Sequence, residues 1–213
     1  MTIFFPSMLK TYTECPKKYF YNYIEKISMP QNNIPFEKGK KIHALANYFI
    51  KGVDVTKLEK SLNDYEKRVW EYLKNSKYFK MELLESEYQI SAKIDKYWIG
   101  GRLDALVKDK NNYYILDYKT GSIPDKPVYD FQTMIYFYCT DKKIKQYNTL
   151  NFIYIDLKNF KDFKVCFDNE IKKEYYKKLV ATIYNITSDN LYQPKVLKDI
   201  KCNCNNLKLC MKK

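Results

Sequence analysis

ILDYKTG, residues 115–121, decides how the fold is interpreted, because an otherwise apolar strand carries an aspartate and a lysine near its end. Side chains alternate between the two faces of a strand, so Asp117 and Lys119 project to the same side. On this stretch alone, an exposed ion pair on an edge strand is the simpler explanation, and such a pair contributes only about 0 to 1 kcal/mol. The surrounding sequence must decide whether the pair is catalytic.

The strand before this stretch carries a second acid. GRLDALV, residues 101–107, contains Asp104, and a turn over residues 108–112 would make the two strands antiparallel neighbours. Two carboxylates would then converge near one end of the sheet and offer the oxygen ligands that magnesium prefers. Lys119 is placed to orient or help deprotonate a metal-bound water and to stabilise charge on a phosphate. The carbonyl of Tyr118 is a further candidate ligand.

Length and composition are those of a globular protein with a substantial core. The 213 residues are 46% hydrophobic and 30% charged, which predicts one α/β domain. The net charge of +13 favours a polyanionic partner such as nucleic acid. Only Arg68 and Arg102 are arginines, and all the other basic residues counted in this charge are lysines. An AT-rich genome would produce such an excess of lysine without selection for binding. The charge therefore supports nucleic acid without naming it.

The sequence carries no pattern of a secretory signal and no run of roughly 20 apolar residues. We therefore expect a cytoplasmic protein that does not enter a membrane. In that compartment the six cysteines argue against structural disulfides. Cys139 and Cys166 fall in expected core elements and are interpreted as packing residues.

Helical spacing and strand patterns predict a mixed sheet with helices on both sides. Ser7 is the expected N-cap of a short first helix. The inward stripe of a long helix over residues 56–74 is expected to be Leu58, Leu62, Tyr65, Val69 and Leu73. The other helices are expected over 17–27, 36–50, 130–140 and 169–186, and the strands over 83–94, 97–109, 112–120, 149–157 and 162–168.

GRLDALV followed by ILDYKTG resembles the core of the PD-(D/E)XK nuclease superfamily in its RecB-type branch. The resemblance implies that Asp104 and Asp117 are the metal-binding acids and that Lys119 is the motif lysine. EKGKKIHALANYF, residues 37–49, resembles the family's helix with a metal-binding histidine, which implies that His43 is a ligand. On its own, a lone histidine on an amphipathic helix is more often a packed or exposed residue.

DFQTMIYFY, residues 130–138, resembles the family's glutamine and tyrosine helix. The resemblance implies that Gln132 and Tyr136, four apart on one helix face, brace the active site or touch the DNA backbone. An ordinary aromatic core helix is the alternative. Glu85 and Glu87 precede the GRLD strand, where relatives often carry a glutamate, and the sequence does not choose between them.

The cysteines resemble the one-plus-three set that holds an iron–sulfur cluster in CRISPR-associated adaptation nucleases and helicase-linked RecB-type nucleases. The set is Cys15 with Cys202, Cys204 and Cys210, which implies a 4Fe-4S cluster that joins the two ends of the chain. One residue separates Cys202 from Cys204, where the family usually shows two. Zinc in a four-cysteine site and a vestigial tail remain alternatives.

The resemblance runs from about Ser7 to Cys210. It implies a restriction-endonuclease-like central mixed sheet in one domain over 1–213, with a helical part over about 1–80, a nuclease core over about 81–190 and a cysteine-rich tail over about 191–213. The implied activity is an Mg²⁺- or Mn²⁺-dependent deoxyribonuclease, an exonuclease on single-stranded DNA or duplex ends, in CRISPR adaptation or recombination and repair. The implied partners are DNA and proteins of an adaptation or recombination complex. A DNA- or protein-binding subunit with little activity and a cluster-bearing redox protein are the rival functions.

Overall fold

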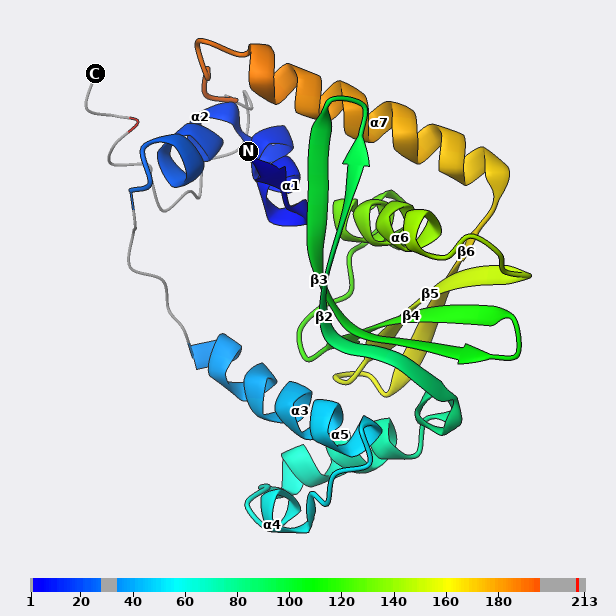
Figure 1. Ribbon diagram of the computed structural model, residues 1–213. Coiled ribbons are helices and arrows are strands. Elements are labelled where there is room, and N and C mark those ends of the chain that lie inside the picture. Colours follow the sequence, from blue (N-terminus) through cyan, green and yellow to red (C-terminus); the bar gives the residue numbers. More distant parts are fainter. Residues whose placement is uncertain (1, 28–33, 196–209, 211–213) are drawn as a thin grey trace.

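The computed structural model describes residues 2–27, 34–195 and 210, with the side chains of 34–38 left out. A mixed six-stranded sheet lies at its centre, with helices on both faces (Figure 1). The strands are β1 (Ile3–Phe4), β2 (Glu82–Ile94), β3 (Tyr97–Asp109), β4 (Asn112–Lys119), β5 (Thr149–Asp156) and β6 (Lys161–Phe167). The helices are α1 (Pro6–Glu14), α2 (Pro16–Tyr19), α3 (Ile34–Ile50), α4 (Thr56–Glu59), α5 (Asp64–Lys74), α6 (Phe131–Lys143) and α7 (Asn169–Ser188).

The long strand β3 organises the sheet. On one side it pairs antiparallel with β2 along its whole length. On the other side it pairs with β1 at Trp98 and Ile99, and with β4 only from Ala105 onward. Between Ile99 and Ala105, no described strand pairs with this side of β3. The sheet therefore has a gap beside Asp104, and β4 continues on its far side as the parallel neighbour of β5.

The sheet separates two apolar cores. Strand side chains alternate between faces, so Leu106, Ile115 and Phe152 pack with α1, α6 and α7, and Leu116, Ile153 and Ile155 pack with α3 and α5. Burying each such apolar side chain contributes about 1.5 to 3 kcal/mol. The two helical layers lie on opposite sides of the sheet in Figure 1. A site at the gap in the sheet can therefore receive side chains from both layers.

The predicted single helix over residues 56–74 is wrong. The chain forms α4 and α5 instead, because Asn63 starts a new helix: its side chain accepts from the Glu66 amide, and the Glu66 carboxylate accepts from the Asn63 amide. The break turns two of the expected inward residues outward, and Leu58 and Tyr65 are exposed. The other three, Leu62, Val69 and Leu73, are buried.

Several smaller predictions can also be compared with the structure. Phe5, and not Ser7, is the N-cap of α1. Cys139 is buried as predicted, whereas Cys166 is exposed because it lies on β6, where only Val165 is fully buried. The strand β1 was not predicted, since two residues are too short to show a pattern. Among the described residues, no helix combines the length and apolar character needed to cross a membrane.

Candidate active site

Asp117 and Lys119 form a charged pair at the end of β4. The Lys119 Nζ lies 2.8 Å from Asp117 Oδ2, and this carboxylate is almost fully buried. The two side chains share a strand face with Ile115 and so lie on the α6 side of the sheet. The pair is therefore not a surface ion pair on an edge strand, since β4 lies between β3 and β5.

Gln132 joins both members of this pair. It lies in the first turn of α6, which begins where the Asp130 side chain accepts from the Gln132 backbone amide. The side-chain nitrogen of Gln132 donates to Asp117 Oδ1, and its oxygen accepts from Lys119 Nζ at 2.9 Å. The amide thus fixes the positions of the acid and the base together.

His43 reaches the site from the opposite helical layer. Its Nδ1 lies 3.2 Å from Asp104 Oδ1 and its Nε2 lies 2.9 Å from the carbonyl oxygen of Tyr118. The other oxygen of Asp104 accepts from the Tyr118 amide at 2.7 Å, so this carboxylate bridges the gap between β3 and β4. One turn earlier in α3, a Cβ on Gly39 would lie 2.9 Å from Thr120 Oγ1, so the glycine lets the helix approach this closely.

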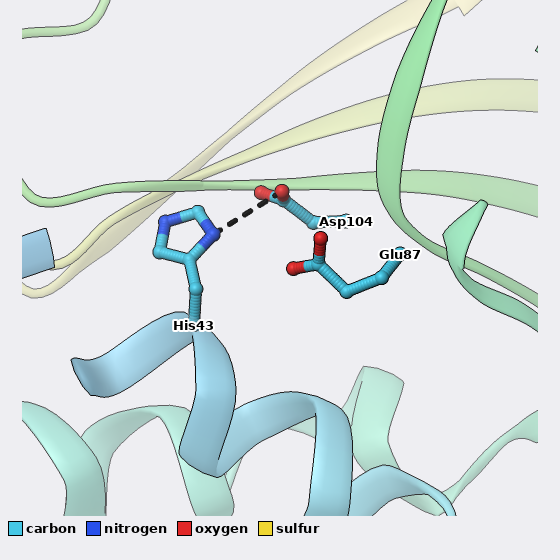
Figure 2. A group of neighbouring side chains, drawn as sticks. All are labelled: His43, Glu87 and Asp104. Atoms are coloured by element: carbon cyan, nitrogen blue, oxygen red, sulfur yellow. Dashed lines mark ion pairs between the residues drawn. The ribbon is translucent and has the colours of Figure 1, made fainter. Parts of the chain in front are cut away.

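Glu87 is the site residue that the sequence left undecided. Its neighbours Ser86 and Tyr88 pair with Ala105 and Leu103, the two residues that flank Asp104 on β3. Ligand atoms of Glu87, Asp104 and His43 lie within 4.8 Å of one another (Figure 2). Its φ of 50° is unusual for a strand residue other than glycine. Glu85 differs in its partner, because its carboxylate pairs with Lys143. Glu87, and not Glu85, is therefore the glutamate that lies beside His43 and Asp104. The alternation of side chains along a strand cannot reveal this, because it depends on the positive φ and on tertiary contacts.

Tyr136 supports the strand that carries Asp104. Its hydroxyl donates to the carbonyl oxygen of Arg102 at 2.8 Å, across the unpaired part of β3. Its ring lies against Gly101, where a Cβ would overlap the ring carbon Cε1. The glycine therefore allows a side chain of α6 to approach β3 closely.

Burial and neighbouring charges set the protonation of the acids and the imidazole. Burial, opposed by Lys119 and reinforced by Asp104, raises the pKa of Asp117 to about 6. Burial alone would lower the pKa of His43, but the hydrogen bond and charge of Asp104 outweigh it, so the pKa is raised. The carboxylate and the carbonyl facing His43 are both acceptors, which matches an imidazolium that donates from both nitrogens.

Three cavities adjoin one another at the site. The central one, of about 850 Å³, is lined by His43, Glu87, Asp104 and Asp117 among others. A second, of about 720 Å³, shares Arg102 and Gln132 with it and extends past Lys10 and Tyr136. A third, of about 560 Å³, shares Thr120 and Gly121 and reaches Tyr65 on α5. Together they can accommodate an extended ligand on both sides of the carboxylates.

These residues fit a divalent cation. Carboxylate, carbonyl and imidazole groups are the ligands that Mg²⁺ and Mn²⁺ accept, and three carboxylates gather around one histidine here. Within the described chain, Asp117 Oδ2 is buried and accepts no well-aligned hydrogen bond, although it is paired in charge with Lys119. The ligand group His43, Glu87 and Asp104 does not include Asp117, whose carboxylate is held by Gln132 and Lys119.

Only half of the predicted cysteine cluster lies in the described residues. Cys15 is half-buried at the start of α2, and Cys210 is half-buried as well. Burial and contact with Cys210, including a side-chain hydrogen bond, raise the pKa of Tyr21, which lies just after α2. Cys202 and Cys204 lie outside the described residues.

A family model described as the PD-(D/E)XK nuclease superfamily matches residues 4–208. The chain belongs to this superfamily. Its sheet and flanking helices accordingly have the predicted restriction-endonuclease-like fold, and membership implies a metal-dependent nuclease.

One solved structure supports the fold. A crystal structure of a putative exonuclease from Eubacterium rectale is similar with a TM-score of 0.57 and 10% sequence identity, covering 94% of this chain and 86% of that chain. A crystal structure of a protein designated SSO0001 has a TM-score of 0.46 and 16% identity, covering 98% of this chain and 85% of the other. A search of curated protein sequences finds no match.

Proposed function

We propose that this PD-(D/E)XK protein is a divalent-metal-dependent deoxyribonuclease that hydrolyses phosphodiester bonds. One observation carries the proposal: His43, Asp104, Asp117 and Lys119, which come from three elements, line or adjoin a single cavity. His43, Glu87, Asp104, Asp117 and the Tyr118 carbonyl are the candidate ligands for Mg²⁺ or Mn²⁺. When bound, such a cation would supply an electrophile that offsets charge on the phosphate.

Lys119 is proposed to act on the attacking water. Its ammonium is held by Asp117 and Gln132 and is only a quarter exposed. A positive charge fixed in this way stabilises negative charge that develops in a phosphoryl transition state without reorganising during the reaction. Gln132 and Tyr136 are proposed as positioning residues, Gln132 for the acid and base, and Tyr136 for β3.

We further propose single-stranded DNA or duplex ends as substrate. The row of three cavities has room for an extended strand, and the chain carries a net charge of +13 that would attract its backbone. Tyrosines beside the cavities, such as Tyr65, offer faces on which unpaired bases stack. An exonuclease of the RecB-type branch, working in CRISPR adaptation or in recombination and repair, remains part of this proposal.

A 4Fe-4S cluster on Cys15, Cys202, Cys204 and Cys210 also remains a proposal. The contact between Cys210 and Tyr21 supports it, because this contact brings the end of the chain to the segment that Cys15 begins. The test is the visible absorbance and iron content of protein purified without oxygen, for wild type and Cys15→Ser. A cluster predicts a broad absorbance that the variant loses, whereas bound zinc and no iron would point to the four-thiolate alternative.

The proposed activity is tested with end-labelled single-stranded and blunt duplex DNA in Mn²⁺, Mg²⁺ or EDTA. We expect cleavage with either cation, none in EDTA, and a loss of about 10² to 10⁴ in rate for Lys119→Met. Lys110→Met is the matched control, since Lys110 lies in the exposed turn after β3. Binding without cleavage under every metal condition would instead identify a DNA-binding subunit.

A further inference from the structure

Arg102 is the arginine at the site, and neither the proposed ligand set nor the proposed water chemistry uses it. It lies two positions before Asp104 on β3, so both side chains project to the same face. It is one of only two arginines in the chain. Its side chain is 66% exposed, and it lines both the central cavity and the one beside Tyr136.

Glu87 holds the Arg102 side chain in place. The Arg102 Nε lies 3.0 Å from Glu87 Oε2, and Glu87 is itself only 22% exposed. Within the described residues this is the one ion pair of Arg102, and it uses Nε, not the two terminal nitrogens of the guanidinium. A guanidinium binds a phosphate with two parallel hydrogen bonds, which a lysine does not provide.

The two positive groups closest to the carboxylates are already engaged. Lys119 is held by Asp117 and Gln132, and His43 faces Asp104 and the Tyr118 carbonyl. A DNA strand entering this cavity meets three carboxylates and is repelled unless positive charge faces its phosphates. Arg102 lines both cavities, one together with Lys40 and the other with Lys10, and it is the one arginine among these cations.

Glu87 has two alternative positive partners. It pairs with Arg102, and its carboxylate also belongs to the group that can hold a metal ion with His43 and Asp104 (Figure 2). A divalent cation that takes up the negative charge of Glu87 weakens the hold of this carboxylate on the guanidinium. With a cation bound, Arg102 would be held less tightly by Glu87 and would be available to the strand.

Building on the nuclease function proposed above, we propose that Arg102 grips a backbone phosphate of the DNA strand and that Glu87 restrains Arg102 until a divalent cation binds. Arg102 is a binding and positioning residue in this arrangement. The consequence is that metal and DNA each strengthen the binding of the other, because affinity coupling between two ligands is reciprocal.

The experiment measures binding of a fluorescent single-stranded oligonucleotide by anisotropy, in EDTA and in Ca²⁺, over a series of salt concentrations. We expect wild-type affinity to be about tenfold or more higher in Ca²⁺ than in EDTA. Arg102→Ala should lose most of this gain and reduce the slope of log affinity against log salt by about one. Arg68→Ala is the matched control: it removes the other arginine, which is exposed on α5, and should keep both the gain and the slope.

Glu87→Gln tests the restraint separately. The neutral amide cannot hold the guanidinium by charge, so this variant should bind DNA in EDTA about as tightly as wild type binds it in Ca²⁺. Arg102→Lys, which keeps the charge and most of the packing, should keep the salt slope and recover only part of the affinity. If Arg102→Ala matches Arg68→Ala in affinity and slope, or if Glu87→Gln binds weakly in EDTA, the inference is overturned.

Failure of this inference and failure of the nuclease proposal give different results. If the wild type cleaves DNA and Arg102→Ala binds DNA normally, the proposed phosphate contact of Arg102 is refuted and the nuclease proposal stands. Absence of cleavage with every cation, combined with Arg102-dependent binding, removes the hydrolytic activity and leaves the grip.

Discussion

The Nε2 of His43 and the carbonyl oxygen of Tyr118 lie 2.9 Å apart, although 75 residues separate them in the chain. On the other side of the same ring, Nδ1 faces Asp104. The imidazole thus stands between two acceptors, both of which are candidate metal ligands. A metal ion that binds one ring nitrogen must replace the proton on that nitrogen, whereas the other ring nitrogen can keep its hydrogen bond.

Metal affinity is therefore expected to depend on pH. The pKa of His43 is raised, mainly by Asp104 against the effect of burial, and that of Asp117 is raised to about 6 by burial. If these candidate ligands bind metal, they must first lose their protons, so Mn²⁺ affinity should rise as pH increases from about 5 through the raised pKa values and then level off. Calorimetry in buffers with different ionisation enthalpies measures the protons released. Near pH 6.5, His43→Gln should release fewer, and an unchanged number would contradict this assignment.

Replacing Asp117 by asparagine is expected to stabilise the metal-free protein while abolishing cleavage. The folded-state pKa of about 6 lies above the ordinary value near 3.9, so the folded protein prefers the protonated acid and ionisation opposes folding at pH 7. The gain should be about 1 to 3 kcal/mol at pH 7 and should shrink to nothing as the pH falls toward 4. Urea denaturation in EDTA measures it.

Asp109→Asn serves as the control for this stability effect, because Asp109 is an exposed residue at the end of β3. It should change the free energy of unfolding by less than about 0.5 kcal/mol at either pH. A destabilised Asp117→Asn variant at pH 7 would mean that the ion pair with Lys119 outweighs the cost of burying the charge.

Glu85 and Glu87, both on β2, are expected to differ sharply in their effect on metal binding. Glu87→Gln removes a carboxylate from the group with His43 and Asp104 and should weaken Mn²⁺ binding about tenfold or more. Glu85→Gln removes one that pairs with Lys143, away from this group, and should leave Mn²⁺ binding unchanged. Titration of Mn²⁺ followed by its electron paramagnetic resonance measures both. Equal effects of the two substitutions would exclude Glu87 as a ligand.

Gly101→Ala is expected to disturb the site through Tyr136. The added methyl group overlaps the tyrosine ring, so α6 and β3 must separate, at a cost of about 1 to 3 kcal/mol. Gly121→Ala is the matched control, because a Cβ there meets no atom within 4 Å. A double-mutant cycle with Tyr136→Ala measures the coupling by chemical denaturation. If Gly101→Ala lowers the free energy of unfolding equally in the wild-type and Tyr136→Ala backgrounds, the contact with the tyrosine ring is not the cause of the destabilisation.

The sequence predicted the strands and the α/β class well, because alternating and continuous apolar patterns set β2 to β5 directly. It predicted Asp117 and Lys119 on one face, and the structure places them there. The break before α5, which is caused by a pair of capping hydrogen bonds at Asn63, was not predicted. The apolar residues of α4 and α5 follow one continuous helical spacing, so the pattern does not show the break. The domain boundaries and the cytoplasmic location stay predictions.

Glu87 and Arg102 show why the site could be only partly derived from the sequence. Their pairing depends on the register of β2 against β3 and on a positive φ, and neither has a signature in composition or spacing. Gln132 and His43 were named through family resemblance, since a glutamine or a lone histidine on a helix has no chemistry of its own that predicts a partner. Tertiary contacts between distant segments supply what local patterns lack.

The fit between the bare backbone at position 101 and the ring at position 136 constrains how related sequences can diverge. A relative with a larger residue at position 101 needs a smaller one at position 136. It then also lacks the tyrosine hydroxyl that hydrogen-bonds to β3. Some relatives are too distant for their sequences to be aligned with confidence. In such proteins, a glycine matched to a large ring at these two positions, together with the paired acids, would indicate that the same arrangement around the central cavity is present.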